Sequence, residues 1–154
     1  MTEPFAMPIV PRYAEIDQQG VVFNGHYLTW FDEASTAFFD YLGLPFPEFH
    51  ALGLDVQVVH AELDYLAPVR WQDAVRVVTR CESVGTTSFA LRFDVLRHRA
   101  GGDDDVAAVR GRNVYVVVST EDWTKRELPP KLREALTSVA GQGRNGRDDG
   151  TVSP

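Results

Sequence analysis

The stretch GHYLTWFDEASTAFFDYL, residues 25–42, decides the fold. Its apolar residues recur every three or four positions, which predicts one helix with a broad apolar stripe made of Tyr27, Trp30, Phe31, Ala34, Phe38 and Tyr41. Asn24 is a suitable N-cap, and Gly43 followed by Pro45 ends the helix. The opposite side is also apolar, because it carries Leu28, Ala37, Phe39 and Leu42. We therefore expect other structure to surround this helix.

Apolar residues alternate in the chain after this helix, which predicts four β-strands, at residues 56–66, 74–83, 88–98 and 106–119. The short links between them predict an antiparallel meander. Residues 8–14 predict a further strand, which Pro11 restricts to a sheet edge or an irregular start. Pro129 and Pro130 open a short closing helix at residues 131–139. The expected fold class is α+β, with an antiparallel five-stranded sheet wrapped around a long central helix.

The composition is that of one globular domain. The chain has 154 residues, of which 44% are hydrophobic and 24% are charged. We assign residues 1–140 to the domain. Residues 141–154 contain four glycines and no aromatic residue, which predicts a flexible C-terminal tail. The single cysteine, Cys81, excludes an intramolecular disulfide and a Cys-rich zinc cluster, and we expect no metal.

The charge balance argues against polyanionic macromolecular partners. Fifteen Lys and Arg against 22 Asp and Glu give a net charge of −7, so we expect neither nucleic acid nor an anionic membrane to be a partner. No apolar run approaches the length of a membrane span, and no secretory signal is readable at the N-terminus. These features predict a cytoplasmic protein.

Residues 13–32, YAEIDQQGVVFNGHYLTWFD, resemble the hot-dog-fold acyl-CoA thioesterases, and more narrowly the 4-hydroxybenzoyl-CoA thioesterase branch. The shared features are an Asp, two further residues, a Gly, a short apolar run and a polar pair that opens the long helix. Residues 84–89, VGTTSF, resemble the turn before the penultimate strand of that family, and residues 128–136 resemble its closing helix. The resemblance covers residues 8–139. It implies a hot-dog fold, an acyl-CoA substrate, and a homodimer or homotetramer with shared sites.

Asp17 is the candidate catalytic residue. It lies in a polar stretch just before the helix, so its carboxylate can face a substrate held at the helix N-terminus. Such a carboxylate either attacks the thioester carbonyl or acts as general base on a water molecule. A thiol with a pKa of about 8.5 leaves readily as thiolate, so one carboxylate and an oxyanion site suffice without a cofactor. The alternative is that Asp17 only makes turn hydrogen bonds.

Gly20 and Gly25 bracket a segment whose backbone can approach a ligand. N–H groups at a helix N-terminus suit a developing oxyanion, and the resemblance places the donor near Asn24 or Gly25. Many relatives carry His where this chain has Asn24 and Asn where it has His26. In this chain, His26 either hydrogen-bonds the thioester carbonyl or packs beside Tyr27.

The resemblance implies a wider set of substrate-binding residues, namely Gly20, Val22, Phe23, Tyr27, His60, Thr87 and Ser88. His60 shares a strand face with Glu62 and Asp64, and this face either lines the pocket or meets solvent. Thr87 and Ser88 lie in a turn whose residue types turn preference explains equally well. The densest basic cluster comprises Arg97, Arg99, Arg110 and Arg112. It suits the phosphates of CoA, through Arg97 and Arg99, or serves only solubility.

These observations predict an acyl-CoA thioesterase that releases CoA and a free acid. Serine-hydrolase, P-loop and dinucleotide-binding motifs are absent from the sequence. One alternative within the fold is a hydratase or dehydratase, which needs a catalytic His that only His26 or His60 can supply. Another is a non-catalytic acyl-CoA binding module. Release of free thiol separates hydrolysis from both.

Overall fold

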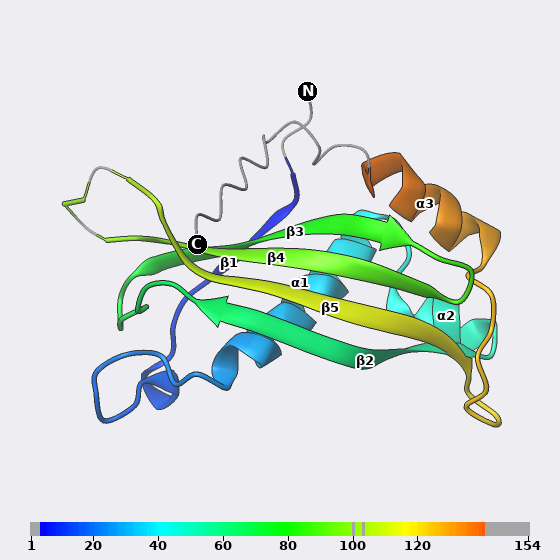
Figure 1. Cartoon of the computed structure of the whole chain (residues 1–154), viewed down its shortest axis with the longest axis horizontal. Helices are drawn as coiled ribbons and strands as arrows, with labels where there is room; N and C mark the ends of the chain where they lie inside the picture. Colours follow the sequence, from blue (N-terminus) through cyan, green and yellow to red (C-terminus); the bar gives the residue numbers. More distant parts are fainter. Residues whose placement is uncertain (1–3, 100, 103, 141–154) are drawn as a thin grey trace, which may run out of the picture.

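An antiparallel five-stranded sheet carries a long helix on one face (Figure 1). The structure is a computed structural model that describes residues 4–99, 101–102 and 104–140. Its elements are β1 (Ala6–Ile9), η1 (Tyr13–Glu15), α1 (His26–Tyr41), α2 (Phe46–Ala51), β2 (Leu54–Tyr65), β3 (Ala74–Val84), β4 (Ser88–His98), β5 (Val106–Ser119) and α3 (Pro130–Ala140). The predicted α+β class is confirmed. The expected flexible tail, residues 141–154, lies outside the described residues.

The strand order is β1-β3-β4-β5-β2, so the predicted meander is wrong for β2. β2 pairs with β5 from Leu54↔Ser119 to Tyr65↔Val109, and not with β3, its successor in the chain. The link at residues 66–73 does not force β2 and β3 to be neighbours, because it is too long for a tight turn. Eight extended residues span about 26 Å, which is several times the spacing between adjacent strands. It crosses at the N-terminal end of α1, where the Val22 N–H donates to the Val69 carbonyl at 2.8 Å. This crossing brings the link to the candidate site.

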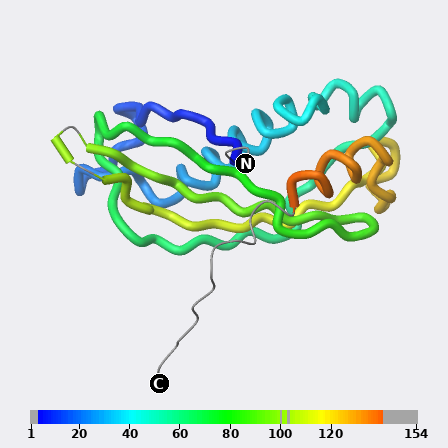
Figure 2. Tube along the Cα trace, turned by 90° about the horizontal axis from the view of Figure 1, so that it is seen from above, coloured from blue at the N-terminus to red at the C-terminus, as the bar shows by residue number. Residues whose placement is uncertain are grey.

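The apolar stripe of α1 is buried as predicted, except for Tyr41, which is 58% exposed. Trp30, Phe31 and Phe38 are at most 2% exposed, and the Phe31 ring stacks on Phe93 of β4 with centroids 4.6 Å apart. Figure 2 shows α1 running along one side of the curved sheet. Leu28 and Tyr41 lie on the outward side and are exposed in this chain.

Several predicted boundaries change. The first strand is Ala6–Ile9, before the predicted 8–14, because Pro11 ends it and residues 13–15 form a 3-10 turn. The short helix α2 was not predicted. Asn24 is not the N-cap of α1: Gly25 takes that position, and no side chain caps the helix. Gly43, with a φ of +78°, ends α1 as expected. Within the described part of the chain, no helix is both long and apolar enough to cross a membrane.

Candidate active site

A loop between η1 and α1 carries Asp17, and a buried glutamate fixes this loop to the helix. Glu15 is 3% exposed, and its Oε2 accepts a hydrogen bond from the Trp30 indole at 2.7 Å. The Glu15 carbonyl also accepts from the Phe23 N–H at 2.9 Å, which closes the loop on itself. The position of Asp17 is therefore set by contacts to the core of α1.

Asp17 begins a tight turn that ends at Gly20. One carboxylate oxygen, Oδ1, accepts from the Gln19 N–H at 2.8 Å and lies 3.5 Å from the Val21 nitrogen. The Gly20 N–H donates to the Asp17 carbonyl at 2.9 Å, and Gly20 has a φ of +78°. The turn hydrogen bonds of the alternative reading are thus present. They use Oδ1 only, because Oδ2 accepts no hydrogen bond from any described residue.

Asp17 lines a pocket of about 340 Å³ beside the start of α1. Two segments distant in sequence form its walls. The lining residues are Asp17, Gln19, Val21, Val22, Asn24, Tyr27, Tyr65, Leu66, Ala67 and Pro68. The pocket thus places a carboxylate, a helix N-terminus and two phenol rings around one space.

The backbone at the start of α1 has free donors. Among the described residues, neither the Asn24 N–H nor the Gly25 N–H donates a backbone hydrogen bond. The Tyr65 hydroxyl donates to the Asn24 carbonyl at 3.1 Å and links the end of β2 to this point. His26 is half-buried and lies edge-on to the Phe23 ring, with centroids 5.7 Å apart.

Tyr27 is the most deeply buried aromatic residue of the pocket lining. It is 3% exposed, and its ring lies edge-on to Tyr65 at a centroid distance of 5.9 Å. Burial is the main cause that raises the pKa of Tyr27 to about 12; the Val69 backbone N–H opposes this increase, and the nearby Tyr65 and Asp17 contribute to it. The hydroxyl therefore stays protonated at neutral pH.

The predicted residues divide into those in the pocket and those away from it. Asp17, Val22, Asn24 and Tyr27 line it. Gly20, Phe23 and Gly25 of the same loop, and His26 at the start of α1, flank it but are outside its lining. Thr87 and Ser88 lie at the β3–β4 turn, at the end of the sheet beside α3, whereas α1 begins at the opposite end (Figure 1). One chain does not bring this turn to the pocket.

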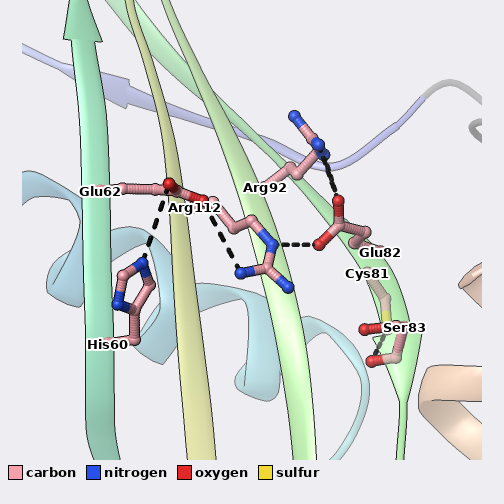
Figure 3. A network of polar contacts seen from close by, with 7 residues as sticks. All are labelled: His60, Glu62, Cys81, Glu82, Ser83, Arg92 and Arg112. Carbon is pink, nitrogen blue, oxygen red and sulfur yellow. Dashed lines mark hydrogen bonds and ion pairs between the residues drawn. The ribbon is translucent and has the colours of Figure 1, made fainter.

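His60 lies in a charged network on the sheet face opposite α1 (Figure 3). Its Nε2 is 3.8 Å from a Glu62 carboxylate oxygen, and Glu62 is 3.7 Å from Arg112. Arg112 also contacts Glu82, which accepts from Arg92 at 2.7 Å. Burial opposes ionisation of Glu82, but these arginines outweigh it and hold its pKa below the ordinary value. His60 is therefore on the other side of the sheet from the pocket.

The basic cluster expected from the sequence is divided between the two faces of the sheet. Arg110 and Arg112 pair with carboxylates on the face opposite α1. Arg97 and Arg99 contact the Pro68 carbonyl, at 2.8 and 3.2 Å, beside the pocket. The strand register explains this division, because residues opposite each other on paired strands share a face of the sheet. Arg97 lies opposite Val75, whereas Arg110 lies opposite Asp94 on the other face.

Sequence reasoning did not find one wall of the pocket. Tyr65, Leu66, Ala67 and Pro68 come from the end of β2 and the following link. No motif marks them, since only the crossing of this link brings them to α1. Within the ranges described, no group of three His, Cys, Asp or Glu side chains has a metal-binding arrangement.

A five-stranded antiparallel sheet around one helix, with a carboxylate at the start of that helix, defines the class of protein as a hot-dog α+β fold. The model of the thioesterase-like superfamily matches residues 11–136. The chain belongs to this superfamily and is a thioester hydrolase. The predicted family resemblance is confirmed.

Two relatives and one solved structure illustrate the similarity. An Aquifex aeolicus protein named as an esterase is 25% identical over 134 residues, covering 84% of this chain and 98% of its own. A Bacillus subtilis protein named as an acyl-CoA thioesterase is 32% identical over 71 residues, 46% of this chain and 51% of its own. The third is an aspartate-to-asparagine mutant of 4-hydroxybenzoyl CoA thioesterase, complexed with 4-hydroxybenzoyl CoA. It superposes with a TM-score of 0.79 at 21% identity and covers 88% of this chain and 99% of its own.

Proposed function

We propose that this protein hydrolyses an acyl- or aroyl-CoA thioester to a free acid and CoA, with Asp17 as the catalytic carboxylate. The observation that carries the proposal is the pocket, in which the Asp17 carboxylate and the N-terminal end of α1 line one space. The structural relative was crystallised as an aspartate-to-asparagine mutant complexed with 4-hydroxybenzoyl CoA. A complex of this mutant with the CoA thioester agrees with a catalytic carboxylate in that relative.

The chemistry follows from the two carboxylate oxygens of Asp17. Oδ1 is held by the turn, whereas Oδ2 has no described donor and is available to the substrate. Asp17 then attacks the thioester carbonyl to form a mixed anhydride that water hydrolyses, or it removes a proton from an attacking water. In both routes the electron pair of the broken C–S bond leaves with the CoA thiolate. The free N–H groups of Asn24 and Gly25 are the proposed backbone donors to the oxyanion.

Arg97 and Arg99 are the proposed contacts for the phosphates of CoA. Both guanidinium groups lie at the Pro68 carbonyl, and Pro68 lines the pocket. Arg99 also pairs with Asp73 at 3.2 Å, while Arg97 has no carboxylate partner in the described part of the chain. Arg97 is therefore the better anion contact of the two.

A second copy of the chain is the proposed source of two of the remaining predicted residues, Thr87 and Ser88. β2 is a twelve-residue edge strand, and Val58 and Val59 on it are 47% and 59% exposed. Antiparallel pairing of two β2 strands across a twofold axis reverses one sheet relative to the other. The partner's turn with Thr87 and Ser88 then lies at the same end as α1's N-terminus in this chain.

Thiol release from a panel of CoA thioesters tests the proposal. We expect the wild-type protein to release CoA from at least one of acetyl-, hexanoyl-, palmitoyl-, phenylacetyl- and 4-hydroxybenzoyl-CoA. Asp17→Asn should abolish this release. Binding without thiol release by the wild-type protein would favour the non-catalytic module. With an enoyl-CoA as an additional substrate, loss of its chromophore without thiol release would favour a hydratase.

A further inference from the structure

Tyr27 presents a hydroxyl at the pocket whose oxygen faces the Val69 backbone N–H and whose proton has no acceptor among the described residues. The residue is 3% exposed and lines the same space as Asp17. Its hydroxyl donates no hydrogen bond to any of the described residues, although the ring is held on two sides by Trp30 and Tyr65. A buried phenol normally finds a partner for its O–H, so this donor is available to a ligand.

We propose that the Tyr27 hydroxyl donates a hydrogen bond to the substrate's thioester carbonyl and stabilises the oxyanion that forms there. Tyr27 is then a catalytic residue that keeps its proton throughout the reaction. This inference rests on the proposed hydrolysis and adds a side-chain donor to the backbone donors at the start of α1. A rigid donor in a recessed pocket suits this role, because it costs no reorganisation when charge develops.

Tyr27 is the phenol of the pocket whose proton is available to a ligand. The other phenol of the pocket, Tyr65, already donates its proton to the Asn24 carbonyl at 3.1 Å. Gly25, whose N–H is one of the proposed backbone donors, flanks the pocket and is outside its lining. Tyr27 adds a side-chain donor on the wall of the pocket itself.

The electrostatics of the site agree with a donor role. Burial, together with a smaller effect of the nearby Asp17 carboxylate, raises the pKa of Tyr27 to about 12. Between pH 6 and 10 the phenol therefore remains neutral, and its O–H is available as a donor over this whole range.

Steady-state kinetics of Tyr27→Phe test the proposal, with the best thioester of the panel as substrate. We expect kcat to fall at least tenfold, and of the order of a hundredfold, because one oxyanion donor is lost. KM should stay within about threefold. Tyr41→Phe is the matched control, since it removes one hydroxyl from an exposed tyrosine at the far end of the same helix. Its kcat should equal that of the wild type.

The bound carbonyl gives a second readout, which does not depend on turnover. The probe is a ketone analogue of the same substrate, with CH₂ in place of the thioester sulfur and ¹³C at the carbonyl. A strong donor moves the carbonyl resonance downfield on binding to wild-type protein, and this shift should be lost in Tyr27→Phe. If the variant does not fold, the wild-type spectrum decides, because a resonance upfield of its position in water contradicts the proposal.

The outcomes distinguish a failure of the Tyr27 proposal from a failure of the proposed Asp17-dependent hydrolysis. Asp17-dependent hydrolysis with an unchanged kcat in folded Tyr27→Phe overturns the role of Tyr27 alone. An identical carbonyl resonance in the two proteins does the same. Wild-type hydrolysis that survives Asp17→Asn overturns the proposed catalytic carboxylate and leaves the Tyr27 measurement to stand by itself. A wild-type protein that releases no thiol overturns both.

Discussion

Glu15 is a buried charge whose hydrogen bonds hold the Asp17 loop in place. Its carboxylate accepts from the Trp30 indole at 2.7 Å and from the Arg12 backbone N–H at 2.8 Å. Burial disfavours the charged form, but these donors outweigh burial and hold the pKa of Glu15 below its ordinary value of 4.5. The loop therefore depends on an ionised Glu15.

This ionised state predicts a pH-dependent contribution to stability. A carboxyl whose pKa is lower in the folded than in the unfolded state stabilises the fold above its unfolded pKa, and this is lost as pH falls through the folded pKa. We expect Glu15→Gln to lower the free energy of unfolding at pH 7 by roughly 1–3 kcal/mol. Urea denaturation at pH 7, 5, 4 and 3 should show the difference from wild type shrinking below about pH 4.5. A difference that stays constant over this range would contradict the assignment.

Between elements, the contact of α1 with the sheet depends on a glycine in β5. A Cβ at Gly111 would clash with the Phe31 ring, which lies against this position and stacks on Phe93. The missing side chain is what allows the helix to approach the centre of the sheet.

Gly111→Ala should therefore destabilise the protein by about 1–3 kcal/mol through overpacking. Thermal or urea denaturation measures this loss. Phe31→Leu provides the matched background, because a smaller side chain leaves room for the new methyl group. In that background Gly111→Ala should lower the free energy of unfolding clearly less. Equal losses of stability in both backgrounds would show that the clash with Phe31 is not the cause.

The elements differ in how far local sequence determines them. The periodicity of residues 25–42 is sufficient for α1, and turn residues at 84–87 and 100–105 are sufficient for the β3–β4 and β4–β5 hairpins. The partner of β2 was not predictable in this way, because a long link permits either neighbour and only packing around α1 selects β5. α2 was missed because six residues containing Pro47 give no helical period.

The candidate site shows the same division. Asp17, Val22, Asn24 and Tyr27 fall in one motif, and folding keeps them together. Tyr65 and Pro68 join them only through the crossing of the β2–β3 link, which leaves no local pattern. Whether His60 reaches the pocket depends on the sheet face on which it lies. Whether Thr87 and Ser88 reach a pocket depends on the assembly of two chains. Neither can be predicted from local sequence.

At the scale of the whole molecule, the exposed β2 edge predicts self-association. Light scattering after size exclusion should give a mass of at least two chains. Val59→Lys places a charge on the edge strand and should shift the protein towards monomer. Val106→Lys is the control, since Val106 is 36% exposed but lies on β5, an interior strand. A wild-type monomer at assay concentration would contradict pairing through β2.

The central claim is that Asp17 carries out thioester hydrolysis, and one comparison tests it most directly. The measurement is kcat for CoA release by wild type, by Asp17→Asn, and by Asp32→Asn as an exposed control on α1. We predict a loss of several orders of magnitude for Asp17→Asn and an unchanged rate for Asp32→Asn. Retention of wild-type kcat by a folded Asp17→Asn protein would contradict it.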